Sequence, residues 1–153
     1  MHFSIRPATI DDAEAVTTLA EELNAYIRSL GDKTNFTFSS AAYVRDGFGG
    51  DSAFYGLVAE NEGVIVGYLL YHFAYDTDHG RRLAYIADVY VQPGSRGHGI
   101  GKALMRRAAE VVRERGVESL WWGVYKHNES AFRFYESLGA QYLSDIRFMS
   151  MDV

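Results

Sequence analysis

A glycine cluster between a strand-like run and an amphipathic helix constrains this chain more than any other feature. Residues 96–102 read Arg-Gly-His-Gly-Ile-Gly-Lys. The run at 83–91 before them is rich in strand-forming residues, and apolar residues recur at helical spacing from Ile100 to near Gly116. Such a turn leaves backbone N–H groups unpaired at the positive end of the helix dipole. The sequence therefore predicts an α/β protein with a candidate phosphate or pyrophosphate cradle here; a plain glycine-rich turn with a helix cap is the alternative.

Helix and strand patterns alternate along the rest of the chain. Helices are predicted at 10–30, after the capping-box-like pair Thr9 and Asp12, at 39–46 and at 130–138. Strands are predicted at 2–6, 54–60, 64–75, 118–125, 141–143 and 147–151. Asn61-Glu62-Gly63 marks a hairpin turn. This order predicts a mixed, mostly antiparallel sheet flanked by helices, in a single domain of residues 1–153.

Composition excludes several classes of function. The 153 residues include 15 Lys and Arg against 20 Asp and Glu, a poor footprint for nucleic-acid binding. The chain has no cysteine, which removes disulfide scaffolds, Cys-ligated metals and thiol catalysis. Its five histidines lack metal-ligand spacing, so no metal is expected. The polar start is no signal peptide and the apolar run at 64–75 is too short to span a bilayer. We expect a soluble, cytoplasmic protein without nucleic-acid or membrane partners.

The glycine cluster fails two common phosphate-binding motifs. A dinucleotide fingerprint beginning at Gly97 would need glycine where Lys102 stands, and a P-loop would need Ser or Thr where Ala103 stands. The cluster does resemble the R-x-x-G-x-G signature of the GNAT superfamily of N-acetyltransferases, carried here by Arg96, Gly99 and Gly101. Residues 128–140 are similar to that family's second signature, N-x-x-[AS]-x-x-[FL]-Y-x-x-x-G. The resemblance implies the GNAT fold, with acetyl-CoA as co-substrate.

Further motifs narrow the resemblance to the diamine (spermidine/spermine) acetyltransferase branch. The similarity runs over roughly residues 3–144. It is carried by Asp46-Gly47-Phe48-Gly49, Phe54-Tyr55, Leu57-Val58-Ala59-Glu60, Val66-Gly67 and Phe73-x-Tyr75-Asp76. Members of this branch are usually homodimers, which the resemblance implies for this chain as well. The last predicted strands and exposed aromatic residues are the candidate interface.

The resemblance also assigns a cofactor site and a general acid. In the family, a bulged strand grips the pantetheine arm and supplies a backbone N–H to the thioester carbonyl, while the glycine loop grips the pyrophosphate. The implied cofactor residues are Val89, Tyr90, Val91, Arg96, Gly97, His98, Gly99, Ile100, Gly101, Lys102, Asn128, Ser130 and Ala131. Tyr135 matches the family's general acid; a tyrosine is protonated at neutral pH and can protonate the departing thiolate. The alternative for Tyr135 is a packing role.

The acceptor site departs from the branch at two positions. The branch has a glutamate, its favoured base, where this chain has Ala87; Asp88 follows and is the candidate base, with a hydrogen-bonded structural role as the alternative. Tyr26 matches an acceptor-site tyrosine, but Ile27 replaces the acid that follows it. Glu22 lies on the same predicted helix as a candidate amine contact, or simply on a solvated face. Trp121 and Trp122 alternate faces of a strand, so we expect one in the core and the other at the site, with Trp122 as the candidate site residue.

These observations predict an acetyl-CoA-dependent N-acetyltransferase acting on a primary amine of a small molecule. Ala87 and Ile27 replace two acidic residues of the branch. Their replacement favours a shorter or less charged amine than a polyamine, such as an amino-acid side chain or a small diamine. The alternative is a non-catalytic acyl-CoA-binding or interaction module on the same fold. Charge supports the cofactor assignment, because residues 96–115 carry six basic and two acidic side chains in a chain whose net charge is −5.

Overall fold

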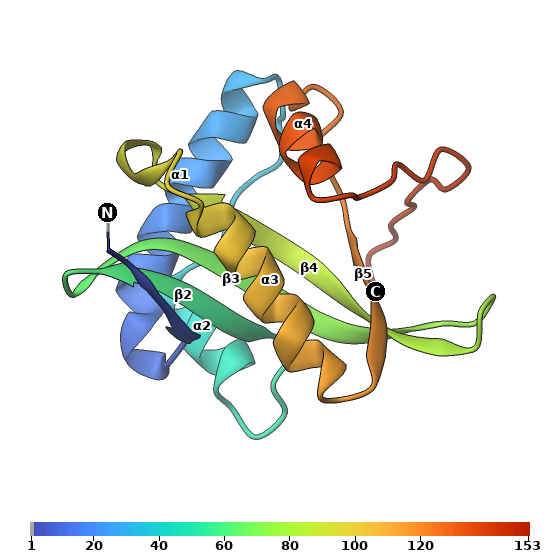
Figure 1. Ribbon diagram of the computed structural model, residues 1–153, viewed down its shortest axis with the longest axis horizontal. Coiled ribbons are helices and arrows are strands. Elements are labelled where there is room, and N and C mark those ends of the chain that lie inside the picture. The colour runs from blue at the N-terminus through green and yellow to red at the C-terminus, as the bar shows by residue number, and fades with distance from the viewer. Residues whose placement is uncertain (1) are drawn as a thin grey trace. The chain divides into compact units, whose positions relative to one another are not determined.

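The computed structural model describes residues 2–153, which form two compact units joined after Gly123. The first unit contains a five-stranded sheet in the order β1-β2-β3-β4-β5 (Figure 1). Its strands are β1 (Ser4–Pro7), β2 (Tyr55–Asn61), β3 (Val64–Asp76), β4 (Arg81–Val91) and β5 (Val117–Trp122). The first four strands pair in antiparallel fashion, and β5 pairs parallel to β4 after a helical crossover. The predicted mixed, mostly antiparallel sheet is confirmed.

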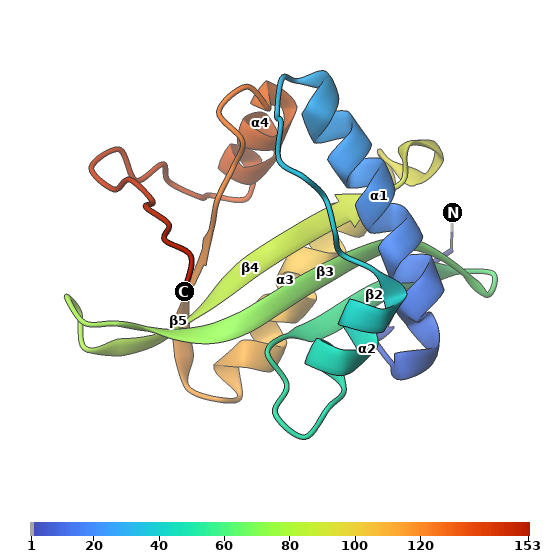
Figure 2. The same ribbon diagram turned by 180° about the vertical axis from the view of Figure 1, so that it is seen from behind.

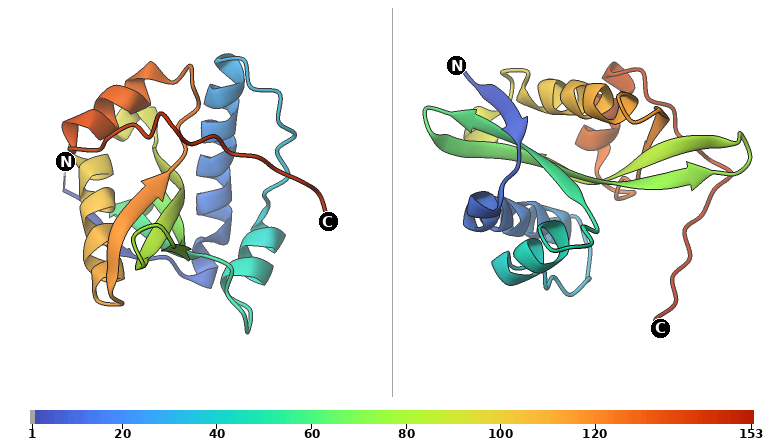
Figure 3. Two further views of the ribbon diagram at one scale, coloured as in Figure 1. Left: turned by 90° about the vertical axis from the view of Figure 1, so that its right-hand side faces the viewer. Right: turned by 90° about the horizontal axis from the view of Figure 1, so that it is seen from below.

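Helices cover both faces of this sheet. α1 (Ala13–Ser29) and α2 (Ser40–Gly47) lie on one face, and α3 (Ile100–Arg113) lies on the other (Figures 2 and 3). The single-turn helices η1 (Ile10–Asp12) and η2 (Pro93–Ser95) precede α1 and α3. Because both faces are buried, successive residues of the central strand are apolar, and β3 is buried without a break from Val66 to Tyr71.

Local sequence signals set several of the boundaries. Glu62 and Gly63 both have positive φ, at 51° and 81°, as a tight hairpin turn between β2 and β3 requires. The Thr9 N–H donates to Asp12 Oδ2 at 2.7 Å, so the predicted capping interaction is present. The first turn of the helix predicted at 10–30 is the 3₁₀ turn η1, however, and α1 itself begins only at Ala13.

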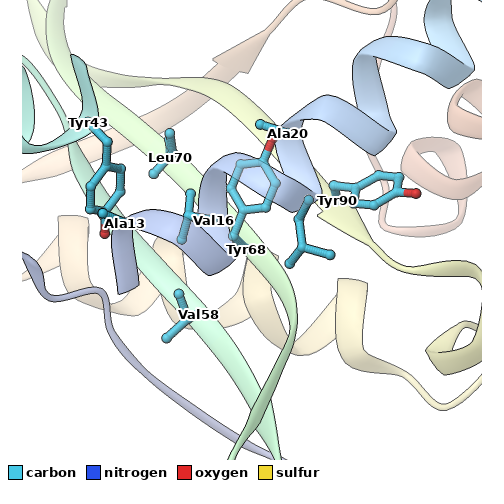
Figure 4. Packing of buried hydrophobic residues seen from close by; sticks show 9 residues of the cluster. Ala13, Val16, Ala20, Tyr43, Val58, Tyr68, Leu70 and Tyr90 are labelled. Carbon is cyan, nitrogen blue, oxygen red and sulfur yellow. The ribbon is translucent and has the colours of Figure 1, made fainter. Parts of the chain in front are cut away.

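Three tyrosines help to build the core between α1, α2 and the sheet. Tyr43, Tyr68 and Tyr90 are buried there (Figure 4). They pack with Ala13, Val16, Leu19, Ala20, Val58 and Leu70. Each hydroxyl has a hydrogen-bond acceptor: the Thr9 carbonyl, Asp88 and Glu22, respectively. The chain has 11 tyrosines, and three of them are therefore explained by core positions at which the hydroxyl also finds a hydrogen-bond partner.

The second unit, Val124–Val153, contains one helix, α4 (Glu129–Ser137). The strands predicted at 141–143 and 147–151 are wrong: residues 140–153 have no strand structure. The alternating apolar pattern is present, but a strand forms only where a neighbouring strand supplies backbone hydrogen bonds. These residues pair with none of the five described strands, so pattern alone did not decide their conformation.

Candidate active site

A β-bulge interrupts β4 at the position where the candidate base was expected. Leu70 of β3 is opposite Asp88, whereas the next residue, Tyr71, is opposite Ile86. Ala87 is therefore the extra residue, with no counterpart in β3. A bulge bends its strand and changes the direction of the side chains that follow. It places Asp88 and Tyr90 on the face that α1 covers, because Tyr90 belongs to that core and side chains alternate along a strand.

The end of β4 also presents an open backbone edge. β5 pairs with β4 only as far as Ile86, which is opposite Trp122. The Gln92 N–H donates to the Val66 carbonyl at 3.0 Å, so the backbone groups of Asp88 and Tyr90 face β3 as well. Those of Val89 and Val91 consequently face the other side, beyond the reach of β5. An extended ligand can bind such an edge as an added strand.

The Asp88 carboxyl lies half-buried next to this edge. The Tyr68 hydroxyl donates to Asp88 Oδ2 at 3.3 Å. Burial raises the pKa of Asp88 to about 6, and the hydrogen bond from Tyr68 opposes part of that rise. A carboxylate with a pKa just below neutrality is charged at pH 7 yet basic enough to accept a proton in a reaction. Tyr68 is a neighbour that the sequence did not reveal, because residues 20 positions apart meet only through the β3–β4 register.

Tyr90 links the glycine loop to α1. Its hydroxyl donates to Glu22 Oε2 at 3.1 Å. The Arg96 guanidinium carbon lies 5.3 Å from the centroid of the same ring, within cation–π range. Arg96 Nε also donates to the Val91 carbonyl at 2.8 Å. A predicted cofactor residue and a predicted acceptor residue are thus joined through one side chain. Glu22 is exposed, but its carboxylate has a partner.

The predicted strand-to-helix loop is present between η2 and α3. Gly97 and Gly99 have φ values of 79° and 81°, a region that disfavours residues with a Cβ, and no atom lies within 4 Å of where their Cβ atoms would be. Gly99 is the N-cap residue of α3. The His98 ring nitrogen Nδ1 lies 2.9 Å from the Arg96 carbonyl, and Lys102 is exposed. Ile100 is buried, so its side chain anchors α3 and only its backbone is available to a ligand.

In the second unit, the two ends of the second signature are helix caps. Asn128 Oδ1 accepts from the Ala131 N–H at 3.2 Å and from the Ser130 hydroxyl at 3.1 Å, at the start of α4. Gly139, with a φ of 86°, ends the helix in a Schellman motif: its N–H donates to Glu136 and the next N–H to Tyr135. Tyr135, in the last two turns of α4, is half-buried.

The remaining acceptor candidates lie on α1 and β5. Tyr26 follows Glu22 by one helical turn on α1, so the two lie on the same side of that helix. Trp122 is the last residue of β5 and is half-buried. Trp121 is half-buried too, and its Nε1 donates to Ser119 Oγ at 3.1 Å. Neither tryptophan is the fully buried core residue that strand alternation predicted for one of them.

Residues 2–153 contain neither a membrane-spanning helix nor a cluster of metal ligands. No helix in this range is long and apolar enough to cross a membrane. Nor do three or more His, Asp or Glu side chains gather there in a group suited to a metal ion.

The fold and the loop before α3 define an acyltransferase of the N-acetyltransferase class. The chain belongs to the Acetyltransferase (GNAT) family, which matches residues 17–140. It is an acetyl-CoA-dependent N-acetyltransferase that transfers acetyl groups to amines.

Similar proteins agree with the diamine branch. The chain is 36% identical to the thialysine N-epsilon-acetyltransferase of Bos taurus over 149 residues, covering 92% of this chain and 85% of that protein. It is 32% identical to the spermidine/spermine N(1)-acetyltransferase-like protein 1 of Homo sapiens, covering 94% of this chain but 21% of that longer protein. A solved tetramutant of the BH1408 protein from Bacillus halodurans has a TM-score of 0.81 at 27% identity, covering 97% of this chain and 99% of that one.

Proposed function

We propose that this enzyme acetylates a primary amine on a small molecule that resembles a lysine side chain or a short diamine, with Asp88 as the base. The observation that carries the proposal is the half-buried Asp88 carboxyl, with a pKa of about 6, next to the open edge of β4. The names of two similar proteins, a thialysine and a spermidine/spermine type of acetyltransferase, support an amine acceptor. Ala87, exposed at the bulge, stands where the branch has a second acid, which favours an acceptor with fewer charges than a polyamine.

The residues on the β4 side fit acetyl-CoA, which supplies the activated acetyl group when bound. Val89 directs its N–H and carbonyl to the open edge, where they can pair with the amides of a pantetheine arm or donate to the thioester oxygen. The space around Gly97 and Gly99 is free for phosphate oxygens at the N-terminus of α3. The same loop contains Arg96, His98, Gly101 and Lys102, of which Arg96 and Lys102 supply positive charge.

The proton balance assigns one role to each of two side chains. An ammonium acceptor gives one proton to the Asp88 carboxylate, directly or through water, and becomes a nucleophilic amine. The nitrogen forms a bond to the acetyl carbon as the carbon–sulfur bond breaks. Tyr135 gives its proton to the departing thiolate. The nitrogen, now bonded to the acetyl carbon, loses a second proton, which returns to the Tyr135 phenolate, and Asp88 releases its proton to solvent. From the family resemblance, Glu22, Tyr26 and Trp122 are proposed to hold the acceptor, and Asn128, Ser130 and Ala131 are proposed to contact acetyl-CoA.

An amine panel tests the proposal. Release of free CoA from acetyl-CoA is measured with thialysine, lysine, putrescine, spermidine and N-terminal peptides. We expect higher kcat/KM for the amino-acid side chains and the short diamine than for spermidine. A preference for spermidine would contradict the expectation drawn from Ala87. If none of these amines liberated CoA while acetyl-CoA still bound, the proposed acceptor class would be wrong.

We further propose that residues 1–153 make one domain and assemble as a homodimer. The family match crosses the boundary between the two units at Gly123, which supports one domain. Seven large apolar side chains between Tyr142 and Val153 are exposed, an apolar surface that a second copy would cover. Light scattering should give the mass of a dimer, and Phe148→Asp with Met149→Asp should shift the protein to monomer. A monomeric wild-type protein would contradict the proposed homodimer.

The cytoplasmic location of the protein stays a prediction.

A further inference from the structure

Tyr68 is a buried polar residue of the first unit whose hydroxyl is directed to the candidate base. Its side chain is fully buried, and its partner is Asp88 Oδ2 at 3.3 Å. Tyr68 is opposite Tyr90 in the β3–β4 pairing, and Asp88 is opposite Leu70, so the hydrogen bond runs diagonally across the two strands. Figure 4 shows the Tyr68 ring within the cluster that packs α1 on the sheet.

We propose that Tyr68 is a positioning residue for acetyl transfer, whose buried hydroxyl orients the Asp88 carboxyl and favours its charged form. The inference rests on the proposed role of Asp88 as the base. The ring is fully buried in the cluster that also contains Val16, Ala20 and Leu70, so close packing restricts its movement and that of its hydroxyl. A donor fixed in this way restricts the carboxyl to few orientations.

The electrostatics of the cluster agree with this role. Burial, followed by the charge of Asp88, raises the pKa of Tyr68 well above 10, so the phenol stays protonated and remains a donor. Asp88 itself is affected by burial, which raises its pKa, and by Tyr68, which lowers it. Further titratable groups on this face include Tyr90 of β4, whose hydroxyl donates to Glu22 of α1, Tyr43 of α2, whose hydroxyl donates to the Thr9 carbonyl, and Tyr26 of α1. The charged groups of α3 belong to the helix on the opposite face of the sheet.

Replacing Tyr68 with phenylalanine separates this role from core packing. Without the hydroxyl, the charged form of Asp88 loses its donor and its pKa rises. The acidic limb of kcat/KM should then move upward by about half a pH unit to one unit, with a larger loss of rate at about pH 6 than at about pH 8. Tyr43→Phe is the matched control. It removes another buried hydroxyl of the same cluster, one that donates to the Thr9 carbonyl, and should leave the limb in place.

A second readout does not depend on catalysis. The titration of the Asp88 carboxyl carbon, followed by NMR, should have a higher midpoint in Tyr68→Phe than in the wild type and in Tyr43→Phe. In the wild type, the Tyr68 Cζ resonance should report the same midpoint, which covers the case in which the variant does not fold. Equal Asp88 midpoints in folded Tyr68→Phe and wild type, or a Tyr68 Cζ resonance that ignores Asp88, would overturn the inference. If the NMR midpoint shifted but the pH profile of kcat/KM did not change, Tyr68 would be shown to interact with the Asp88 carboxyl, and Asp88 would be excluded as the base.

Discussion

The Tyr90 hydroxyl donates to Glu22 Oε2 at 3.1 Å, and so fixes a carboxylate of α1 to the end of β4. If Glu22 holds a cationic acceptor, Glu22→Gln should raise KM for the amine by about 3- to 10-fold with little change in kcat, because one attractive charge is lost. Steady-state kinetics with the best amine of the panel would measure this. Glu21→Gln is the matched control, since it removes an equal charge from an exposed neighbour on the same helix. Equal effects of the two changes would mean that the negative charge of α1 as a whole, and not a direct contact with Glu22, attracts the amine.

Asp88 predicts the pH dependence of the reaction. The carboxyl accepts a proton only in its charged form, which is present above its pKa of about 6 and is lost below it. We therefore expect kcat/KM to rise with pH through about 6. Asp88→Asn should lower kcat by roughly 10²- to 10⁴-fold and remove this acidic limb. A slow Asp88→Asn variant that kept the limb would assign the limb to another group.

Tyr135→Phe tests the general acid. The substitution keeps the ring of α4 but removes the proton donor, so kcat should fall by about 10²- to 10⁴-fold while the affinity for CoA is unchanged. Calorimetric titration with CoA would establish the affinity. Tyr142→Phe is the control, because Tyr142 is an exposed tyrosine of the same unit. A wild-type rate in Tyr135→Phe would exclude Tyr135 as the acid.

Gly99→Ala tests the cofactor loop. The φ of 81° at Gly99 costs an alanine about 1 kcal/mol, and relief of that strain would move the loop before α3. We expect a higher KM for acetyl-CoA and an unchanged KM for the amine. Gly63→Ala has the same φ of 81° in the turn between β2 and β3, again in open space, and should cost similar stability without affecting acetyl-CoA. Thermal unfolding of both variants would verify that the two substitutions cost similar stability.

Ala87→Glu tests the basis of acceptor selectivity. A carboxylate at the bulge adds a negative charge beside Asp88, which should improve kcat/KM for spermidine relative to lysine or thialysine. Ala87→Gln adds nearly the same volume without the charge and should leave the ratio unchanged. An unaltered ratio in Ala87→Glu would show that the missing acid does not determine the acceptor.

Much of the fold could be predicted from the sequence, because its signals are local. The Glu62-Gly63 turn, the Gly99 start of α3 and the Asn128 and Gly139 caps of α4 each depend on residues within a few positions of one another. The strands at 141–143 and 147–151 were predicted on the same kind of evidence and are wrong, because an alternating pattern cannot supply the neighbouring strand that pairing requires.

The sequence by itself therefore determined the order of helices and strands up to α4, the glycine loop and the resemblance that led to the family. Only the tertiary structure decided which side chains surround Asp88 and Glu22. The bulge at Ala87 turns Asp88 and Tyr90 toward α1, and the β3–β4 register brings Tyr68 to Asp88. These hydrogen bonds join residues 20 and 68 positions apart, a distance over which no local pattern carries information.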